Sequence, residues 1–283
     1  METTNYGGIP GEFSEFRNAA IVILPVPYDA TSSWIKGAAK GPRAILEASA
    51  NMELYDIETD SQVYLRGIHT CEPVTENKSP EAIVAAVEKK VVELLGAGKF
   101  VVTIGGNHTV SIGAIKAFAS MYPGLTILHL DAHADLRQSY DGSENNHACV
   151  MARARELCPV VQAGIRSLCK EELEFADTER IIFAHDIPYN PGWPDKVLKL
   201  LSKKVYITID LDVFDPAYLP STGTPEPGGP DYYQVLHLLK QVNRHSEIVG
   251  FDVVELCPNE TEKSSDFLAS KLIYQLLSYR FEG

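Results

Sequence analysis

The sequence predicts an α/β protein with three layers, in which a central, mostly parallel sheet of eight strands is covered by helices on both faces. Eight short apolar runs rich in β-branched residues recur along the 283 residues, and amphipathic segments of helical length separate many of them. Alternation of strands and helices favours a parallel sheet with helices on both faces. The chain shows no long linker, internal repeat or low-complexity segment. We therefore expect a single domain over residues 1–283.

The predicted strands are mostly aliphatic, as expected for a sheet that is covered on both sides. They lie at residues 20–24, 63–68, 100–104, 126–130, 160–165, 181–184, 205–209 and 248–254. Amphipathic helices are predicted at residues 79–95, 110–120 and 231–242. The pair Gly41 and Pro42 is typical of a helix start. In sheets of this kind ligands bind outside the carboxyl ends of the strands, so the residues that follow each strand are the candidates for function.

The composition is that of an ordinary globular protein with an excess of acidic residues. The net charge of −13 argues against a nucleic-acid backbone or an anionic membrane as partner. It suits a small cationic partner, although an acidic solvated surface is the commoner reason for such a charge. No run reaches the roughly 18 apolar residues of a membrane span, and the amino-terminal residues lack the features of a signal peptide. The five cysteines are odd in number and show no CxxC spacing, so we expect free thiols and a cytoplasmic protein.

Four predicted strand ends carry imidazole or carboxylate side chains. The segment GGNHT follows residues 100–104, DAHAD follows 126–130, DLDVFDP follows 205–209, and the last strand runs into DVVE. The acidic and imidazole side chains in these segments include His108, Asp131, His133, Asp135, Asp210, Asp212, Asp252 and Glu255. One aspartate at a strand end is often a helix cap or a turn former. Several of them on one edge of a sheet predict a common site.

Converging carboxylates predict a site for cations. Asp131, Asp135, Asp210 and Asp212 carry four negative charges, and Glu255 adds a fifth. Without counter-ions such carboxylates repel one another and take up protons. Two divalent cations neutralise four of these charges, and imidazole and carboxylate ligands without a thiolate suit Mn²⁺ better than a structural zinc. We therefore expect two Mn²⁺ ions per chain, a bridging hydroxide and a cationic substrate.

The same segments, in the same order, resemble the signature blocks of the ureohydrolases, the family of arginases and agmatinases. The blocks are GGNHT, DAHADLR, DLDVFDP followed by STGTPEPGG, and DVVE, and PYDATSSWIKGAAKGPRAI also resembles the amino-terminal part of that family. The resemblance covers about residues 20–260. It implies an arginase-like fold with an eight-stranded parallel sheet, a binuclear manganese centre, a small guanidino substrate and a homo-oligomer, either a trimer or a hexamer.

The resemblance also implies a set of metal ligands, of which Asp131 and Asp210 bridge the two ions. The first ion would be held by His108, Asp131, Asp135 and Asp210, and the second by Asp131, His133, Asp210 and Asp212. Metal-bridging hydroxide would attack the guanidinium carbon, which is a poor electrophile because resonance spreads its charge.

Three further roles follow from the same resemblance. Asp135 would pass the proton of the hydroxide to the leaving amine, and His147 would shuttle protons. Glu255 would orient the guanidinium group through paired charge-assisted hydrogen bonds.

Two departures from the arginase pattern favour a substrate without an α-carboxylate. Where arginases tend to have an asparagine near that carboxylate, this sequence has Arg137, and where they tend to have an acid near the α-amino group, it has Cys169. The blocks DAHADLR and GIRSLCKEE are more similar to agmatinases. We therefore expect hydrolysis of agmatine to urea and putrescine, a reaction of polyamine biosynthesis. Aminopropylagmatine, guanidinobutyrate and arginine are alternatives with the same chemistry.

Two more positions differ from the usual family pattern. Asn107 replaces an acid, so we expect it to orient the imidazole of His108 but to raise its basicity less. Ala148 replaces a glycine after His147, which affects the backbone there. These departures leave open a catalytically silent relative that binds metal. A two-metal phosphoesterase is another alternative. It would need basic residues beside the metals to bind phosphate, and Arg137 is the one basic residue next to the motifs.

Other polar residues near the motifs have simpler explanations. His129, within an apolar run, is expected to be a satisfied histidine of the core. Cys149 and Cys257 are expected to be small buried thiols, and Arg137 a solvated side chain. No GxGxxG or GxxxxGK[ST] motif occurs, so nucleotide binding is not expected.

Overall fold

Eight strands within residues 5–282, the part of the chain that the computed structural model describes, form a single sheet. The strands are β1 Ile21–Val26, β2 Ile68–Thr70, β3 Phe100–Gly105, β4 Thr126–Leu130, β5 Val160–Ile165, β6 Ile181–Phe183, β7 Lys204–Asp210 and β8 Glu247–Val254. Their order is β2-β1-β3-β8-β7-β4-β5-β6, and every neighbouring pair is parallel. The predicted fold class is confirmed, with a sheet that is wholly rather than mostly parallel. Residues 1–4 and 283 lie outside the described residues. They belong to the predicted domain, and residues 1–4 begin the segment predicted to lack a signal peptide.

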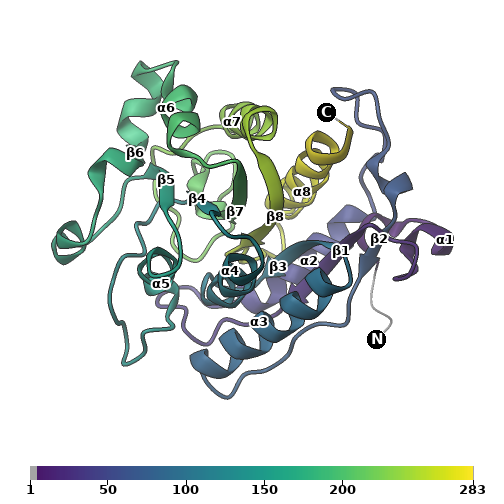
Figure 1. Cartoon of the computed structure of the whole chain (residues 1–283), viewed down its shortest axis with the longest axis horizontal. Coiled ribbons are helices and arrows are strands. Elements are labelled where there is room, and N and C mark those ends of the chain that lie inside the picture. Colours follow the sequence, from purple (N-terminus) through teal and green to yellow (C-terminus); the bar gives the residue numbers. More distant parts are fainter. Residues whose placement is uncertain (1–4, 283) are drawn as a thin grey trace.

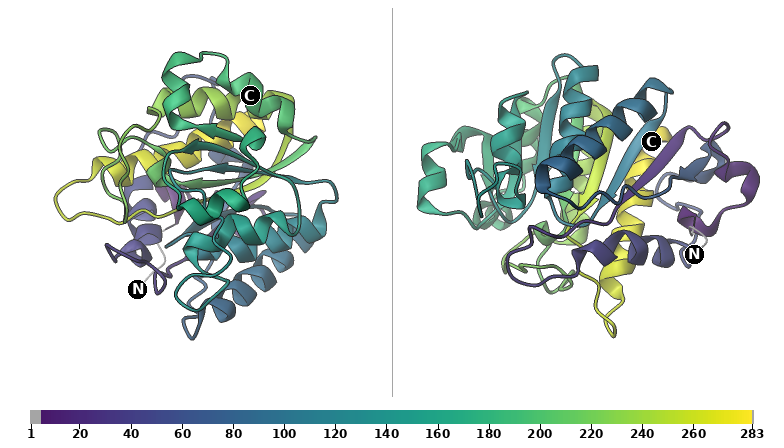
Figure 2. Two further views of the ribbon diagram at one scale, coloured as in Figure 1. Left: turned by 90° about the vertical axis from the view of Figure 1, so that its left-hand side faces the viewer. Right: turned by 90° about the horizontal axis from the view of Figure 1, so that it is seen from below.

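Helices cover both faces of the sheet, as Figures 1 and 2 show. They are α1 Gly11–Ser14, α2 Gly41–Ser49, α3 Pro80–Gly96, α4 Thr109–Met121, α5 Val150–Arg155, α6 Trp193–Leu200, α7 Tyr232–His245 and α8 Ser264–Glu282. One apolar core lies between the sheet and α3, α4 and α5, and a second lies between the sheet and α2, α6, α7 and α8. Side chains of β1 alternate between the cores, with Val22 and Leu24 in the first and Ile21 and Ile23 in the second.

The prediction of a strand at residues 63–68 is wrong for most of these residues. Residues Val63–Arg66 form a 3₁₀ helix, η3, and the strand β2 begins only at Ile68. Gly67 separates the two with a φ of 77°, and its N–H donates to the carbonyl of Tyr64 at 2.9 Å. A left-handed glycine of this kind ends a helical turn, so the apolar run is divided between two elements.

Local capping explains where two of the predicted helices begin. The hydroxyl of Ser79 accepts a hydrogen bond from the N–H of Ala82 at 3.1 Å at the start of α3. At the start of α7, Asp231 accepts from the N–H of Gln234 at 2.8 Å, and the Gln234 side chain accepts from the N–H of Asp231 at 2.9 Å. These bonds satisfy donors that have no partner inside the helix.

Helix α8, with 19 residues, fastens the carboxyl-terminal part of the chain to its beginning. The hydroxyl of Ser270 donates to the carbonyl of Ile45 in α2 at 2.6 Å. The buried amide of Gln275 donates to Asp56 at 2.8 Å. Among residues 5–282, no helix combines the length and the apolar character needed to cross a membrane.

Candidate metal centre

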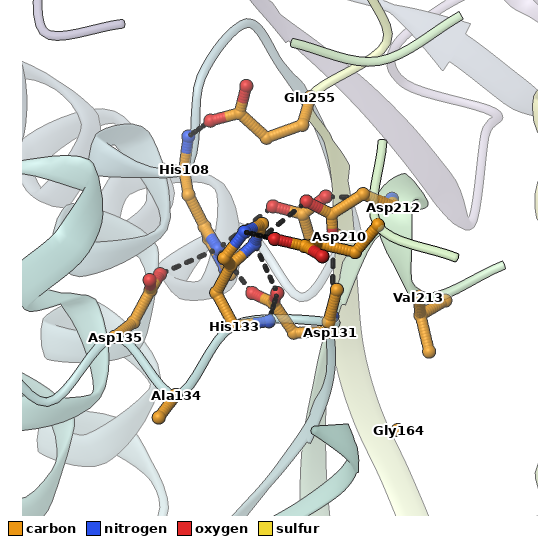
Figure 3. A network of polar contacts seen from close by, with 12 residues as sticks. His108, Asp131, His133, Ala134, Asp135, Gly164, Asp210, Asp212, Val213 and Glu255 are labelled. Atoms are coloured by element: carbon orange, nitrogen blue, oxygen red, sulfur yellow. Dashed lines mark hydrogen bonds and ion pairs between the residues drawn. The ribbon is translucent and has the colours of Figure 1, made fainter. Parts of the chain in front are cut away.

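The predicted site residues follow the carboxyl ends of four adjacent strands. His108 lies after β3, Asp131 directly after β4, Asp210 at the end of β7 and Glu255 directly after β8. The strands β3, β8, β7 and β4 are neighbours in this order at the centre of the sheet. Figure 3 shows these side chains close to the three other predicted ligands at one edge of the sheet. The structure therefore brings all six predicted metal ligands together.

The buried imidazole of His108 faces three carboxylates. Its Nδ1 lies 3.2 Å from Oδ2 of Asp131 and 3.2 Å from Oδ2 of Asp135. Oδ2 of Asp210 is 3.4 Å from the same nitrogen. This Nδ1 has no hydrogen-bond partner among residues 5–282, although His108 is only 1% exposed. A buried nitrogen surrounded by carboxylate oxygens needs a cation, either a proton or a metal.

The second half of the cluster contains His133 and Asp212. Nδ1 of His133 lies 2.9 Å from Oδ2 of Asp212 and 3.5 Å from Oδ1 of Asp131. Oδ1 of Asp212 accepts a hydrogen bond from the N–H of Ala132 at 3.0 Å. The N–H of Asp212 donates to Oδ1 of Asp210 at 2.9 Å. In Asp210 and Asp212, main-chain donors therefore occupy the Oδ1 atoms, and the Oδ2 atoms face an imidazole.

A hydrogen-bonded chain behind His108 fixes the direction of its ring. Nε2 of His108 lies 2.9 Å from the hydroxyl of Thr208 on β7, and this hydroxyl donates to Oδ1 of Asp252 on β8 at 2.7 Å. Because the Thr208 hydrogen is used for Asp252, Nε2 of His108 donates and the lone pair of Nδ1 points at the carboxylates. The hydroxyl of Tyr206 donates to the other oxygen of Asp252 at 2.6 Å. Sequence analysis missed Thr208, although its position two residues before Asp210 places both on one face of the strand.

The two unusual positions beside the ligands do not disturb this arrangement. The side-chain amide of Asn107 donates to the hydroxyl of Thr31 and makes no hydrogen bond to the ring of His108, so the expected role for Asn107 is wrong. Thr208 orients the imidazole instead. Ala148 is not among the non-glycine residues that have a positive φ, so its position does not require a glycine.

Two acidic site residues have a left-handed backbone. Asp135 has a φ of 53° and Glu255 a φ of 67°. Left-handed non-glycine residues cost about 1–3 kcal/mol each and cluster at functional sites. The carbonyl of Asp135 accepts from the N–H groups of Met151 and Ala152 at 3.0 and 3.1 Å, and the N–H of Glu255 donates to the carbonyl of Gly106 at 2.7 Å. These hydrogen bonds hold the strained conformations in place.

Burial and repulsion favour protonation within the cluster. Burial, followed by the charges of Asp212 and Asp131, raises the pKa of Asp210 well above its usual value, and burial also raises the pKa of Asp212. Burial alone would lower the pKa of His108, but its carboxylate neighbours outweigh this effect and raise the pKa well above its usual value. Metal binding at this cluster must therefore release protons.

A cavity of about 280 Å³ opens at the cluster. Glu255 lines it, and Oε1 of Glu255 accepts a hydrogen bond from the N–H of His108 at 2.6 Å. Burial raises the pKa of Glu255 to about 8. A cationic ligand in the cavity would lower this pKa again and restore the charged carboxylate.

His147 also lines the cavity, at the start of the 3₁₀ helix η4 His147–Cys149. Burial lowers the pKa of His147, so its ring is neutral at neutral pH. The ring of Tyr140 contacts it edge to face with centroids 5.9 Å apart, and the guanidinium of Arg137 lies 4.9 Å from the centroid of the Tyr140 ring. Arg137 is therefore partly packed against an aromatic ring in the cavity wall, rather than simply solvated as expected.

Arg166 joins the end of β5 to two loops around the site. Its guanidinium makes six contacts of 2.7–3.3 Å as donor to five main-chain carbonyl groups. These carbonyls belong to Gly164, Asp212, Val213, Phe214 and Glu226. The loop that carries Asp212 is thereby tied to the end of β5 and to the loop at Glu226. Sequence analysis gave Arg166 no role of its own within the block GIRSLCKEE, because nothing in its neighbours along the chain indicates these carbonyl partners.

The residues with simpler explanations behave mostly as expected. His129 is fully buried and both of its nitrogens have partners, which confirms a satisfied core histidine. All five cysteines are free thiols. Cys149 is buried as predicted, but Cys257 is only partly buried, and its thiol lies 3.5 Å from the carbonyl of Lys36.

The donor set fits divalent cations. Two groups of side chains have possible ligand atoms within 4.8 Å of one another, namely His108, His129, Asp131 and Asp135, and Asp131, His133 and Asp212. Asp131 belongs to both groups. The buried, unpartnered Nδ1 of His108 and the carboxylates around it are the donors that Mn²⁺ accepts. This cluster is therefore a candidate site for metal.

The sequence and the fold have counterparts among known proteins. A family model described as the Arginase family matches residues 19–278. The N(1)-aminopropylagmatine ureohydrolase of Synechocystis sp. is 38% identical over 277 residues, which cover 94% of this chain and 90% of the relative. The agmatinase of Pyrococcus horikoshii is 34% identical over 266 residues, which cover 93% of each chain. The crystal structure of the agmatine ureohydrolase of Thermoplasma volcanium has a TM-score of 0.88 at 30% identity, and the match covers 100% of this chain and 96% of that one.

These matches show that the chain, with its wholly parallel eight-stranded sheet, belongs to the arginase family of hydrolases. Within this family the protein is a ureohydrolase, an enzyme that acts on guanidino compounds. The family resemblance inferred from the sequence motifs is confirmed.

Proposed function

We propose that this ureohydrolase uses two Mn²⁺ ions to hydrolyse agmatine to urea and putrescine. The observation that carries the proposal is the convergence of imidazoles and carboxylates from four central strands on one cavity. The relatives named agmatinase or aminopropylagmatine ureohydrolase, which match more than nine-tenths of the chain, support a guanidino amine as substrate.

The proposed centre uses the ligands expected from the sequence. One ion would be held by His108, Asp131, Asp135 and Asp210, and the other by Asp131, His133, Asp210 and Asp212. The distances around His108 support all four ligands of the first ion, and those around His133 support Asp131 and Asp212 as ligands of the second. When bound, a pair of divalent ions supplies the Lewis acidity that generates a nucleophile from water at neutral pH.

Glu255 binds and orients the guanidinium group. Its Oε1 is held by the N–H of His108, which leaves Oε2 free for the substrate. A carboxylate with one oxygen fixed by the main chain presents its second oxygen in a defined direction, and a guanidinium N–H is a strong donor to it. The amidine carbon is thereby held beside the metal ligands.

Asp135 and His147 handle the protons. Asp135 lies at the cluster and lines the cavity, so its carboxylate receives a proton from the attacking water and gives it to the leaving amine. The C–N bond to the amine breaks, and urea and putrescine result. The neutral ring of His147, whose buried Nδ1 has no partner among residues 5–282, exchanges the proton with solvent.

The polar groups of the cavity wall favour an amine over arginine. Cys169 lies where an acid for the α-amino group is expected in arginases, and the Arg137 guanidinium is already packed on Tyr140. The α-carboxylate of arginine would enter an acidic cavity with its best counter-ion engaged elsewhere. Burying a poorly paired carboxylate costs several kcal/mol, which corresponds to at least about 100-fold in kcat/KM.

N(1)-aminopropylagmatine is a second candidate, and two observations favour it. The Synechocystis relative of that name is 38% identical to this chain. The cavity of about 280 Å³ is open at its mouth, where the side chain of Trp34 is 70% exposed. An aminopropyl extension would lie along this mouth.

Urea release from four substrates tests the proposal. The Mn²⁺-loaded enzyme is assayed with agmatine, N(1)-aminopropylagmatine, guanidinobutyrate and arginine. We expect kcat/KM to be highest for one of the two amines and at least about 100-fold lower for arginine. Preference for guanidinobutyrate would mean that Arg137 binds a substrate carboxylate, and it would overturn the choice of an amine. Two bound Mn²⁺ ions without urea from any substrate would identify a silent relative.

The proposal also covers the domain organisation, the oligomeric state and the cellular compartment of the enzyme. Residues 1–283 form one domain that assembles into a trimer or a hexamer in the cytoplasm. The oligomeric state rests on the family resemblance, and the free thiols support a reducing compartment. Light scattering of the purified protein measures the number of subunits.

A further inference from the structure

Asp131 is the carboxylate that faces both halves of the cluster. Oδ2 of Asp131 lies 3.2 Å from Nδ1 of His108, and Oδ1 lies 3.5 Å from Nδ1 of His133. The main-chain N–H of His133 donates to Oδ1, and the Nε2 atom of His129 lies 2.7 Å from Oδ2. Each oxygen of Asp131 therefore has one partner from the protein and retains a lone pair toward the cluster.

The partner of His129 is a residue of the neighbouring strand. His129 on β4 and Gln162 on β5 are paired in register. The side-chain nitrogen of Gln162 lies 2.8 Å from the carbonyl of Ala134 and 3.0 Å from Nδ1 of His129. Neither His129 nor Gln162 is one of the six proposed metal ligands. Among the described residues, neither side chain makes a hydrogen bond to Glu255 or His147 in the cavity wall.

The contact of Gln162 with Ala134 determines the direction of each hydrogen bond in the series that leads through His129 to Asp131. A carbonyl can only accept, so the Gln162 atom beside it is the amide nitrogen, because an amide oxygen there would repel the carbonyl. The same amide group donates to Nδ1 of His129. The hydrogen of the neutral imidazole is then on Nε2, which donates to Oδ2 of Asp131.

Burial of this polar pair is costly, which indicates that the pair has a function beyond packing. His129 is 0% and Gln162 4% exposed. Apolar side chains would fill the same space between two strands without the cost of removing an imidazole and an amide from water. The polar pair supplies what an apolar pair cannot, a fixed N–H donor aimed at a metal ligand.

We propose that His129 and Gln162 are positioning residues that hold Asp131 in the orientation required to bind metal on both sides. This inference rests on the proposed metal centre but not on the identity of the substrate. Without the N–H of His129, the carboxylate of Asp131 can rotate toward the imidazoles, and the metal-binding geometry is lost from part of the population. Outer partners of metal ligands typically contribute about 10- to 100-fold to metal affinity.

Metal affinity of the metal-free protein tests the proposal directly. Chelator-treated protein is titrated with Mn²⁺ in a calorimeter, with the variants His129→Phe, His129→Gln and Gln162→Leu. His129→Phe keeps a ring but has no donor, and we expect a loss of affinity of about 10- to 100-fold. His129→Gln can place an N–H near the position of Nε2, and it should recover most of the affinity. Gln275→Leu is the matched control, because Gln275 is also a buried donor to a carboxylate but lies in α8 beside Asp56.

A second measurement does not depend on the folding of any variant. The ring nitrogens of His129 in the ¹⁵N-labelled, metal-free native protein report the tautomer by NMR, and we expect the hydrogen on Nε2. The Nδ1–H tautomer, or unchanged Mn²⁺ affinity in a folded His129→Phe variant, would overturn the proposal. A native protein that binds no Mn²⁺ would refute the proposed metal centre, and the tautomer would still decide between the two directions of the hydrogen bonds.

Discussion

Replacement of Arg166 by lysine should destabilise the protein and displace the loop that carries Asp212. The guanidinium of Arg166 donates to five main-chain carbonyl groups from the end of β5 and from two loops. A lysine ammonium has three N–H donors and no planar fork. At least two of the carbonyls would therefore lose their partner even with the best placement of the ammonium.

The expected loss of stability follows from this difference. An unsatisfied buried acceptor costs about 1–3 kcal/mol. Because Arg166 is only partly buried, water can reach some of the carbonyls, and we take the lower end of the range. Two acceptors at about 1 kcal/mol each give about 2 kcal/mol, which corresponds to a decrease in Tm of about 4–8 °C for a domain of roughly this size.

Calorimetry of the metal-free protein measures this change without the stabilisation by bound metal. The matched control is Arg153→Lys, because Arg153 binds the carboxylates of Glu144 and Glu156, which an ammonium also satisfies. We expect a clear decrease in Tm for Arg166→Lys and little change for Arg153→Lys. Equal Tm values for the two variants would refute the role of Arg166 as a clamp of main-chain carbonyls. A weaker binding of Mn²⁺ in Arg166→Lys should accompany the lower Tm, since Asp212 lies on the clamped loop.

Three other predictions concern single side chains. Asp135→Asn should lower urea release by about 100-fold or more, because it removes a ligand charge and the proton carrier; near-normal turnover with agmatine would reject this role. Asp252→Asn should lower Mn²⁺ affinity by about 10- to 100-fold, because an amide N–H₂ can face the hydroxyl of Thr208 and disturb the ring of His108; an unchanged affinity in a calorimetric titration would contradict it. For Glu262, burial raises the pKa but hydrogen bonds from nearby serines outweigh it and lower the pKa from 4.5 to about 2. The folded pKa is lowered, so the stabilisation by Glu262 should be complete above pH 4.5 and lost as the pH falls toward 2. Denaturant unfolding of the native protein and Glu262→Gln should therefore differ at pH 7 and converge near pH 2, and a difference that is constant over this range would contradict the assignment.

The sequence was sufficient for the sheet and for the gathering of the ligands, since both depend on local patterns. The apolar runs identify the strands, and in a parallel sheet all carboxyl ends lie at one edge, so Asp131 and Asp210 must lie near each other once β4 and β7 pair. No local pattern in the sequence indicates the order of the strands. The 3₁₀ helix at Val63–Arg66 was missed because its apolar residues resemble those of a strand, and a single glycine with a positive φ decides the outcome.

The supporting residues of the site were much harder to predict. Thr208, Gln162 and Arg166 act through partners that are far away in the sequence, such as Asp252 and the carbonyl of Glu226. Their chemistry is common in strands and loops, and only the register of neighbouring strands shows which groups meet. The role of Asn107 was predicted wrongly for the same reason, because its amide turns toward Thr31 from another loop.

The position of β8 has a consequence for how the enzyme is made. This strand is translated after all the others but lies between β3 and β7. A nascent chain that stops before residue 247 can build only two part-sheets, one with β2, β1 and β3 and one with β7, β4, β5 and β6, and each has an open edge that invites aggregation. His108 belongs to the first part-sheet and Asp131 to the second. Completion of the site proposed for the first ion therefore has to wait until β8 has been translated and joins the two parts, whereas all four ligands proposed for the second ion lie in the second part-sheet.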